Sequence, residues 1–195
     1  MHSRTTAAAL ALFFALACTR GESGPATLAE GDVVKVERLV KGDEVVVTKD
    51  EREARVRQLG IYVFSAVVSD PQVRALSAGG TSALEELVRG KTVKLAFDRT
   101  VQDEAGRYLA YLELDGTDVG RRMVEEGWAV VYTEYPFARE GAYLAAETMA
   151  RAKGRSLWGL KPASDLVRGL RRQWLETRRA RGGAAPADAL MAETP

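Results

Sequence analysis

The sequence predicts an α+β domain in which a five-stranded β-barrel carries helices. Five short segments rich in β-branched residues lie between residues 33 and 114, and a helical segment separates the third from the fourth. The longest helical patterns all follow the fifth segment. The composition, 46% hydrophobic and 28% charged, is that of a soluble globular protein.

Turn signals delimit the expected strands. These are residues 33–40, 44–48, 53–61, 92–97 and 107–114. Lys41-Gly42 joins the first two as a hairpin, and Asp115-Gly116 ends the fifth. Gly60, inside the third strand, predicts a bulge or a tight bend, as at the corner of a barrel.

Helical patterns with stop signals fill most of the remaining domain. The expected helices are residues 81–89, 118–126, 138–153 and 164–180, with a short extended piece at 129–132. We expect residues 65–80 to be a loop, because Asp70-Pro71 and Gly79-Gly80 interrupt any regular pattern. Five strands with a helix between the third and fourth have the element order of an OB-fold.

The first residues predict export. Residues 1–17 form a signal peptide with Arg4 before an apolar run that is shorter than the roughly 20 residues a bilayer requires. Ala15-Leu16-Ala17-Cys18 resembles a bacterial lipobox, which implies lipid attachment at Cys18. The protein would then be a membrane-anchored lipoprotein of the bacterial cell envelope; the alternative is a secreted protein. Residues 18–30 would be a tether.

Signal cleavage narrows the possible chemistry. The only histidine, His2, would leave, and the only cysteine, Cys18, would carry lipid. The mature domain would then have no disulfide, no Cys/His zinc site and no histidine-dependent nucleophile. Carboxylates, arginines, lysines, hydroxyls and a hard metal ion bound by oxygen remain.

The end of the chain predicts a basic amphipathic helix at residues 161–181 and a disordered tail at 182–195. This segment contains seven basic residues and two acidic ones, Asp165 and Glu176. It could bind phosphate backbones, or lie on anionic lipid. Alternatively, Leu166, Leu170 and Trp174 pack on the barrel and the arginines face solvent.

Four pieces of sequence, in order, resemble the thermonuclease (staphylococcal-nuclease-like) family. They are Lys41-Gly42-Asp43, Val56-Arg57-Gln58-Leu59, Gly106-Arg107-Tyr108-Leu109-Ala110-Tyr111 and Leu157-Trp158-Gly159. The resemblance identifies residues 31–160 as a thermonuclease-like OB-fold domain. It implies a family that cleaves nucleic acid with a calcium ion, carboxylates and two arginines.

The resemblance implies roles for particular residues. Asp43 matches a calcium ligand, with Glu44 as a possible helper, while Arg57 and Arg107 match the arginines that contact the phosphate. Tyr135 aligns with a tyrosine near the nucleotide, whereas Trp128 and Trp158 are expected to be core anchors.

Two acidic positions of the family are degenerate in this chain. Tyr62 stands where the family has a second calcium ligand, and Ser65 stands where it has a glutamate that activates water. Calcium takes roughly six to eight oxygen ligands, several of them carboxylates. The sequence therefore predicts a protein that binds nucleic acid, a nucleotide or another phosphodiester, with weak or absent phosphodiesterase activity.

Three alternatives stay open. Glu44, Asp103 or Glu104 could replace the lost acids and give an active calcium-dependent endonuclease. An insertion could shift the alignment, which would make Asp70-Pro71 the acidic stretch. The domain could also be a protein-interaction module without enzymatic activity.

Overall fold

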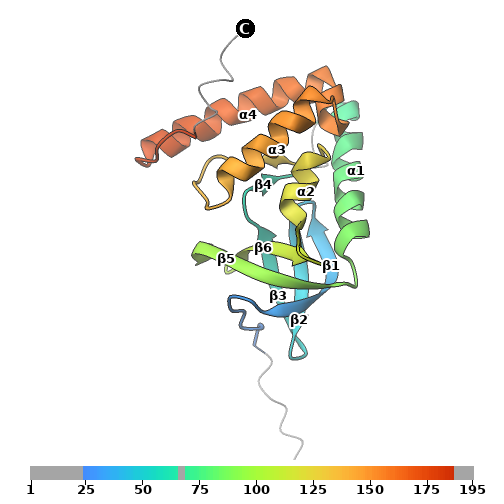
Figure 1. Cartoon of the computed structure of the whole chain (residues 1–195), viewed down its shortest axis with the longest axis vertical. Coiled ribbons are helices and arrows are strands. Elements are labelled where there is room, and N and C mark those ends of the chain that lie inside the picture. The colour runs from blue at the N-terminus through green and yellow to red at the C-terminus, as the bar shows by residue number, and fades with distance from the viewer. Residues whose placement is uncertain (1–23, 66–68, 187–195) are drawn as a thin grey trace, which may run out of the picture.

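The computed structural model describes residues 24–65 and 69–186 (Figure 1). A β-barrel forms one end of the molecule and four helices cover the other end and one flank. Within the described residues, no helix combines the length and apolar character needed to cross a bilayer. The predicted signal peptide and the lipidation at Cys18 lie outside these residues.

Five strands close into the barrel, as the sequence predicts. They are β1 (Val33–Lys41), β2 (Glu44–Lys49), β3 (Arg52–Gln58), β5 (Thr92–Gln102) and β6 (Tyr108–Leu114). Antiparallel pairs run in the order β3-β2-β1-β5-β6, and a parallel pairing of β3 with β6 completes the ring. Gly60, at φ +75°, provides the bend after β3.

Three short strands extend this sheet system. β7 (Thr117–Asp118) pairs with β6, while β4 (Ile61–Tyr62) pairs with β8 (Val130–Val131) in a separate ribbon. The ribbon contains the central two residues of the extended piece expected at 129–132. It carries the chain from the barrel to the helices, so Tyr62 lies between these two parts of the molecule.

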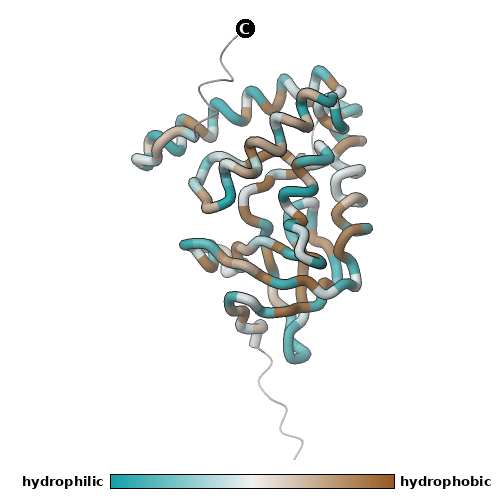
Figure 2. Tube along the Cα trace, viewed as in Figure 1, coloured by the Kyte–Doolittle hydropathy of each residue, from teal (hydrophilic) through white to brown (hydrophobic). Residues whose placement is uncertain are grey.

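Alternating burial explains the barrel core. Val34 and Val36 of β1 are buried, while Val33 before them and Lys35 between them are exposed, as a strand with one covered face requires. Apolar segments gather inside the barrel and beneath the helices (Figure 2). Ala26 and Leu28 also belong to this core, so the folded domain begins before the boundary expected at residue 31.

The loop expected at 65–80 is wrong from residue 71 onward, where α1 (Pro71–Val88) begins. Asp70 caps this helix by accepting hydrogen bonds from the amides of Gln72 and Val73, at 2.8 and 3.1 Å. Pro71 occupies the first turn, where a missing N–H costs nothing. Asp70-Pro71 is thus a helix start rather than a break.

The glycine pair inside α1 has a packing role. A Cβ at Gly79 would lie 2.7 Å from the ring of Trp128, and one at Gly80 would lie 3.1 Å from the Trp128 carbonyl oxygen. The helix tolerates two glycines because the main chain after α2 (Val119–Glu125) approaches it there. Trp128 is partly buried against the core, as expected of an anchor.

Asp70→Ala is expected to lower the free energy of unfolding by about 1 kcal/mol, because two amides of the first turn lose their acceptor. Asp70→Asn keeps a capping oxygen and should cost only a fraction of that amount. Urea denaturation followed by circular dichroism compares the two. An equal loss in both variants would contradict a capping role.

The last two helices pack on each other through ion pairs. They are α3 (Glu140–Ala152) and α4 (Lys161–Ala180), joined by a 3₁₀ turn at Ser156–Gly159. The expected apolar face exists: Trp174 is buried, and Leu166 and Leu170 pack against the same cluster. The arginines, however, do not all face solvent. Arg178 is 5% exposed and donates two hydrogen bonds to Glu140.

Candidate functional site

The closure of the barrel brings the two predicted arginines together. In the parallel pairing of β3 with β6, Val56 lies opposite Tyr108 and Arg57 opposite Leu109, so Arg107 stands at the entrance to β6 beside β3. The antiparallel pairing of β2 with β3 places Glu44 opposite Arg57. Residues from three strands, distant in sequence, therefore surround one point at the rim of the barrel.

The hairpin that carries the acids is packed inward. Asp43 is 3% exposed and Glu44 is fully buried. Gly42 allows this approach, since a Cβ there would lie 2.3 Å from the side chain of Val63. Asp43 and Glu44 are thus held beneath the surface, where each requires a cationic partner.

Arg107 is engaged by two carboxylates. Its Nε donates to Asp103 Oδ2 at 2.8 Å, and its Nη1 donates to Glu44 Oε2 at 2.9 Å. The other oxygen of Glu44 accepts from Arg55 Nε at 2.7 Å. The hydrogen bonds from Arg107 to Asp103 and Glu44 raise the pKa of Arg107 despite its partial burial. Its Nη2 also lies 2.6 Å from Asp103 Oδ2, so each of its three nitrogens is next to a carboxylate oxygen.

Arg57 is held more loosely. Its Nε lies 3.4 Å from Asp43 Oδ2, an ion pair without hydrogen-bond geometry. Its guanidinium lies over the ring of Tyr132, 5.3 Å from the centroid. Because its side chain is 23% exposed, Arg57 is the better placed of the two arginines to donate to an anion from solution.

Tyr62 replaces an acid with an aromatic contact. Its ring packs edge-on against Phe64 at 5.7 Å and against Trp174 of α4 at 5.4 Å. Burial raises the pKa of Tyr62, and the nearby Asp43 carboxylate raises it further, so the phenol stays neutral at physiological pH. Ser65 is exposed and carries no charge.

Calcium does not fit the residues at this position. Across residues 24–65 and 69–186, no three histidine, cysteine, aspartate or glutamate side chains are grouped so as to hold a metal ion. Asp43 faces two cations, Arg57 and Lys41, the latter at 3.7 Å. A neutral phenol stands where a second carboxylate would be needed. The donor set is thus too small and too positive for this ion.

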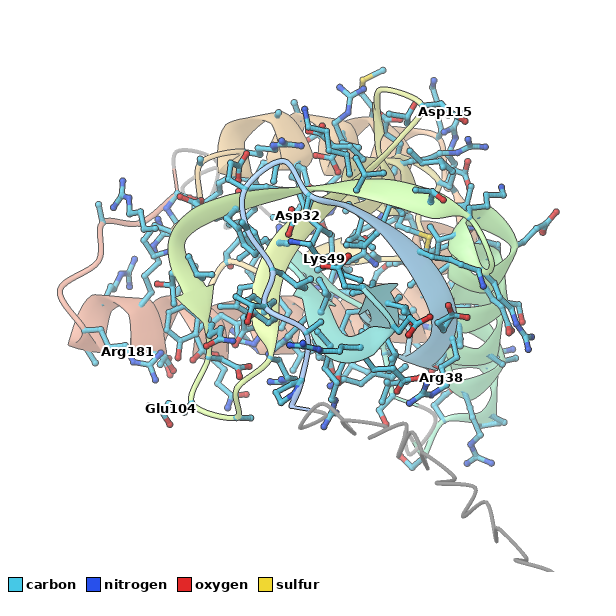
Figure 3. All side chains as sticks on the ribbon, turned by 90° about the horizontal axis from the view of Figure 1, so that it is seen from below. Asp32, Arg38, Lys49, Glu104, Asp115 and Arg181 are labelled. Atoms are coloured by element: carbon cyan, nitrogen blue, oxygen red, sulfur yellow. The ribbon has the colours of Figure 1, made fainter. Side chains whose placement is uncertain are left out.

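The remaining candidates differ in their relation to this centre. Asp103 lies beside Arg107, whereas Asp70 caps α1 and is not part of the site. Tyr135 is 49% exposed, with the Arg181 guanidinium 4.6 Å from its ring centroid. Figure 3 shows Arg181 and Glu104, the residue after Asp103, on the same side of the molecule.

Sequence reasoning missed three contributors. Arg55 is one, although its spacing of two from Arg57 on a strand puts both side chains on one face. Tyr132 and Trp174 are the others, and their role depends on contacts between distant segments that no local pattern contains.

The Asp103–Arg107 pair predicts a pH dependence of stability. Burial alone would raise the pKa of Asp103, but hydrogen bonds from Arg107 outweigh it and hold the pKa below its usual value. The pair therefore stabilises the fold above the pKa of the unfolded chain, about 4, and this contribution disappears as the pH falls through the lower folded value.

Asp103→Asn should accordingly destabilise the protein at about pH 7, and this effect should fade as the pH falls below about 4 and through the lower folded pKa of Asp103. Urea denaturation across this range measures it, with Glu104→Gln as a control for loss of one adjacent negative charge. A difference between Asp103→Asn and wild type that stays constant with pH would contradict the prediction.

The family of this chain is shown by its similarity to known proteins. Residues 55–159 match the family described as staphylococcal nuclease homologue. The thermonuclease of Staphylococcus intermedius is 27% identical over 103 residues, which cover 53% of this chain and 61% of that protein. Endonuclease YncB of Bacillus subtilis (strain 168) is 27% identical over 128 residues, covering 64% and 61%.

The SPbeta prophage-derived endonuclease YokF of the same organism is 29% identical over 128 residues, covering 64% of this chain and 43% of that protein. The chain thus spans less than two thirds of each of these three relatives. The family match includes Arg57, Tyr62 and Arg107 and covers more than half of the chain. This chain belongs to the staphylococcal nuclease homologue family.

Proposed function

We propose that this protein binds nucleic acid, or a nucleotide-like phosphodiester, through Arg57 and Arg107, and that it hydrolyses the bond weakly or not at all. The observation that supports this most directly is the arginine pair at the barrel rim, whose partners among the described residues are the carboxylates of Asp43, Glu44 and Asp103. Guanidinium groups suit phosphate because their planar fork matches its oxygens.

Hydrolysis of the phosphodiester has two chemical requirements. A base must activate water, and positive charge must stabilise the developing anion. Arg57 and Arg107 could supply the charge. Asp43, Glu44 and Asp103 are each paired with arginine, so their oxygens are turned toward cations rather than toward a water molecule.

An active endonuclease is the second candidate, and the similarity of this chain to a thermonuclease and two endonucleases favours it. Glu44 and Asp103 are the acids nearest to Arg107, so they are the residues that such an enzyme would have to use. Family membership makes calcium the metal to test, although this donor set does not fit it. A module that binds another protein is the third candidate.

One experiment separates these candidates. The full mature chain is incubated with single-stranded and double-stranded DNA and RNA, with calcium or with chelator, beside Arg57→Ala/Arg107→Ala. Arg121→Ala/Arg122→Ala is the matched control, because it removes two exposed arginines from α2. Binding without cleavage that is lost only in the first variant supports the proposal.

Calcium-dependent cleavage that requires Arg57 and Arg107 would instead establish the endonuclease. Absence of both binding and cleavage would leave the interaction module. We expect the affinity to fall steeply with salt, because bound phosphates release counterions.

We also propose that the protein is exported and anchored through lipid on Cys18, a residue outside the described part of the chain. Support comes from the apolar run at 7–17, which ends in Ala15-Leu16-Ala17 directly before Cys18. Metabolic labelling with a fatty acid should mark the wild-type protein and leave Cys18→Ala unmarked. Unlabelled wild-type protein in the medium would favour the secreted alternative.

A further inference from the structure

The C-terminal helix α4 contacts the aromatic side of the site. Trp174, the aromatic residue of this helix, is 5% exposed. Its ring lies 5.4 Å from that of Tyr62 and 4.9 Å from that of Tyr132, both in edge-on geometry. Tyr132 in turn lies under the guanidinium of Arg57, at 5.3 Å. A continuous series of contacts thus links α4 to the arginine.

A second set of contacts fixes the segment after β8 from the same helix. Arg178 Nη1 donates to the carbonyl oxygen of Thr133 at 3.1 Å while the same side chain is paired with Glu140. Arg181, just beyond α4, donates to Glu134 at 2.8 Å. The residues that follow Tyr132 are therefore held by α4, which limits how far that ring can move away.

Arg57 depends on this support more than Arg107 does. Arg107 is oriented by hydrogen bonds to Asp103 and Glu44. Arg57 has a longer ion pair with Asp43 and the face of Tyr132. A long flexible side chain with one weak partner populates several rotamers, and an aromatic face below the guanidinium reduces that number.

We propose that Trp174 is a positioning residue for phosphate binding: it holds Tyr62 and Tyr132 in place, and Tyr132 keeps Arg57 directed at the ligand. This inference rests on the proposed function, since it concerns the same arginine. Tyr62 stands where the family has an acid, and in this chain it is a residue through which α4 contacts the site. The helix is a wall of the binding site in this chain.

A double-mutant cycle between Arg57 and Trp174 tests the proposal. The binding of a fluorescein-labelled single-stranded oligothymidylate is followed by anisotropy in wild type, Trp174→Ala, Arg57→Ala and the double variant. Trp174→Ala should weaken binding by about tenfold and lower the salt slope by about one phosphate contact. In the Arg57→Ala background it should have almost no further effect.

Two variants control for packing. Trp174→Phe keeps a ring against both tyrosines and should retain most of the affinity. Val167→Ala removes buried volume from the same face of α4, two turns earlier, and should lower stability without changing the affinity. If Trp174→Ala does not fold, Trp174→Leu takes its place, since it keeps apolar volume without a ring.

A measurement without ligand tests the positioning directly. The ring current of Tyr132 should displace the NMR signal of the Arg57 Nε–H, which is assigned by its absence in Arg57→Ala. The displacement should persist in Val167→Ala and Trp174→Phe and should collapse in Trp174→Ala.

An unchanged signal in Trp174→Ala, or additive losses of affinity in the cycle, would overturn the proposal. Wild-type protein that binds no oligonucleotide would overturn the proposed function, and the phosphate-binding role of Trp174 would fall with it. The NMR signal distinguishes this outcome from a failure of positioning alone.

Discussion

Arg57→Ala is expected to weaken oligonucleotide binding by about tenfold or more. The loss of affinity in Arg107→Ala should be several times smaller. The reason is the state of the two guanidinium groups. Arg107 donates hydrogen bonds to Asp103 and Glu44. Arg57 instead has an ion pair with Asp43 at 3.4 Å and lies over the ring of Tyr132. A phosphate therefore finds more unused donors on Arg57.

Salt titration gives the cleanest measurement of this difference. Loss of one phosphate contact should reduce the slope of log affinity against log salt by about 1 in Arg57→Ala. Arg57→Lys is a useful comparison, because it keeps the charge but loses the planar fork. The ranking would be refuted by an Arg107→Ala variant that binds more weakly than Arg57→Ala.

Tyr62→Asp restores an acid at the family's position, and we expect it to destabilise the protein by about 2 kcal/mol without creating a calcium site. The change removes a ring that packs on Trp174 and Phe64. It also brings a second carboxylate near the buried Asp43, where like charges repel. Arg57 would offset only part of this cost, because Asp43 already uses it.

Urea denaturation in calcium and in chelator measures both expectations. Tyr62→Phe is the matched control, since it keeps the ring contact with α4 and should change stability little. A Tyr62→Asp protein that gains stability with increasing calcium would refute the expectation that the added acid creates no calcium site.

Local patterns predicted the parts of the fold that depend on local physics. The barrel strands follow from alternating burial, as in Val34 and Val36, and the bend follows from Gly60. The first half of α1 was missed because Gly79 and Gly80 look like breakers until Trp128 is seen against them. The start of α1 at Asp70 could have been predicted, since an aspartate before a proline is a capping pattern.

The candidate site was also predicted only in part. The resemblance placed Arg57 and Arg107 together, and the pairing of β3 with β6 agrees with that placement. It could not show that Glu44 accepts hydrogen bonds from Arg55 and Arg107, because those partners are 11 and 63 residues away. For the same reason the burial of Arg178 against Glu140 on α3 was not predictable from the sequence of α4 alone.

The parallel contact between β3 and β6 has a consequence for how the protein unfolds. Arg57 lies in β3 and Arg107 directly precedes β6, so opening the pairing between these two strands would move the two side chains apart. A ligand that needs both arginines would bind the closed ring and not the opened one. Its binding free energy would then oppose opening, and the midpoint of thermal unfolding would rise with ligand concentration. Thermal unfolding curves would therefore report how much of the site is occupied by ligand, and no catalytic activity would be needed for the measurement.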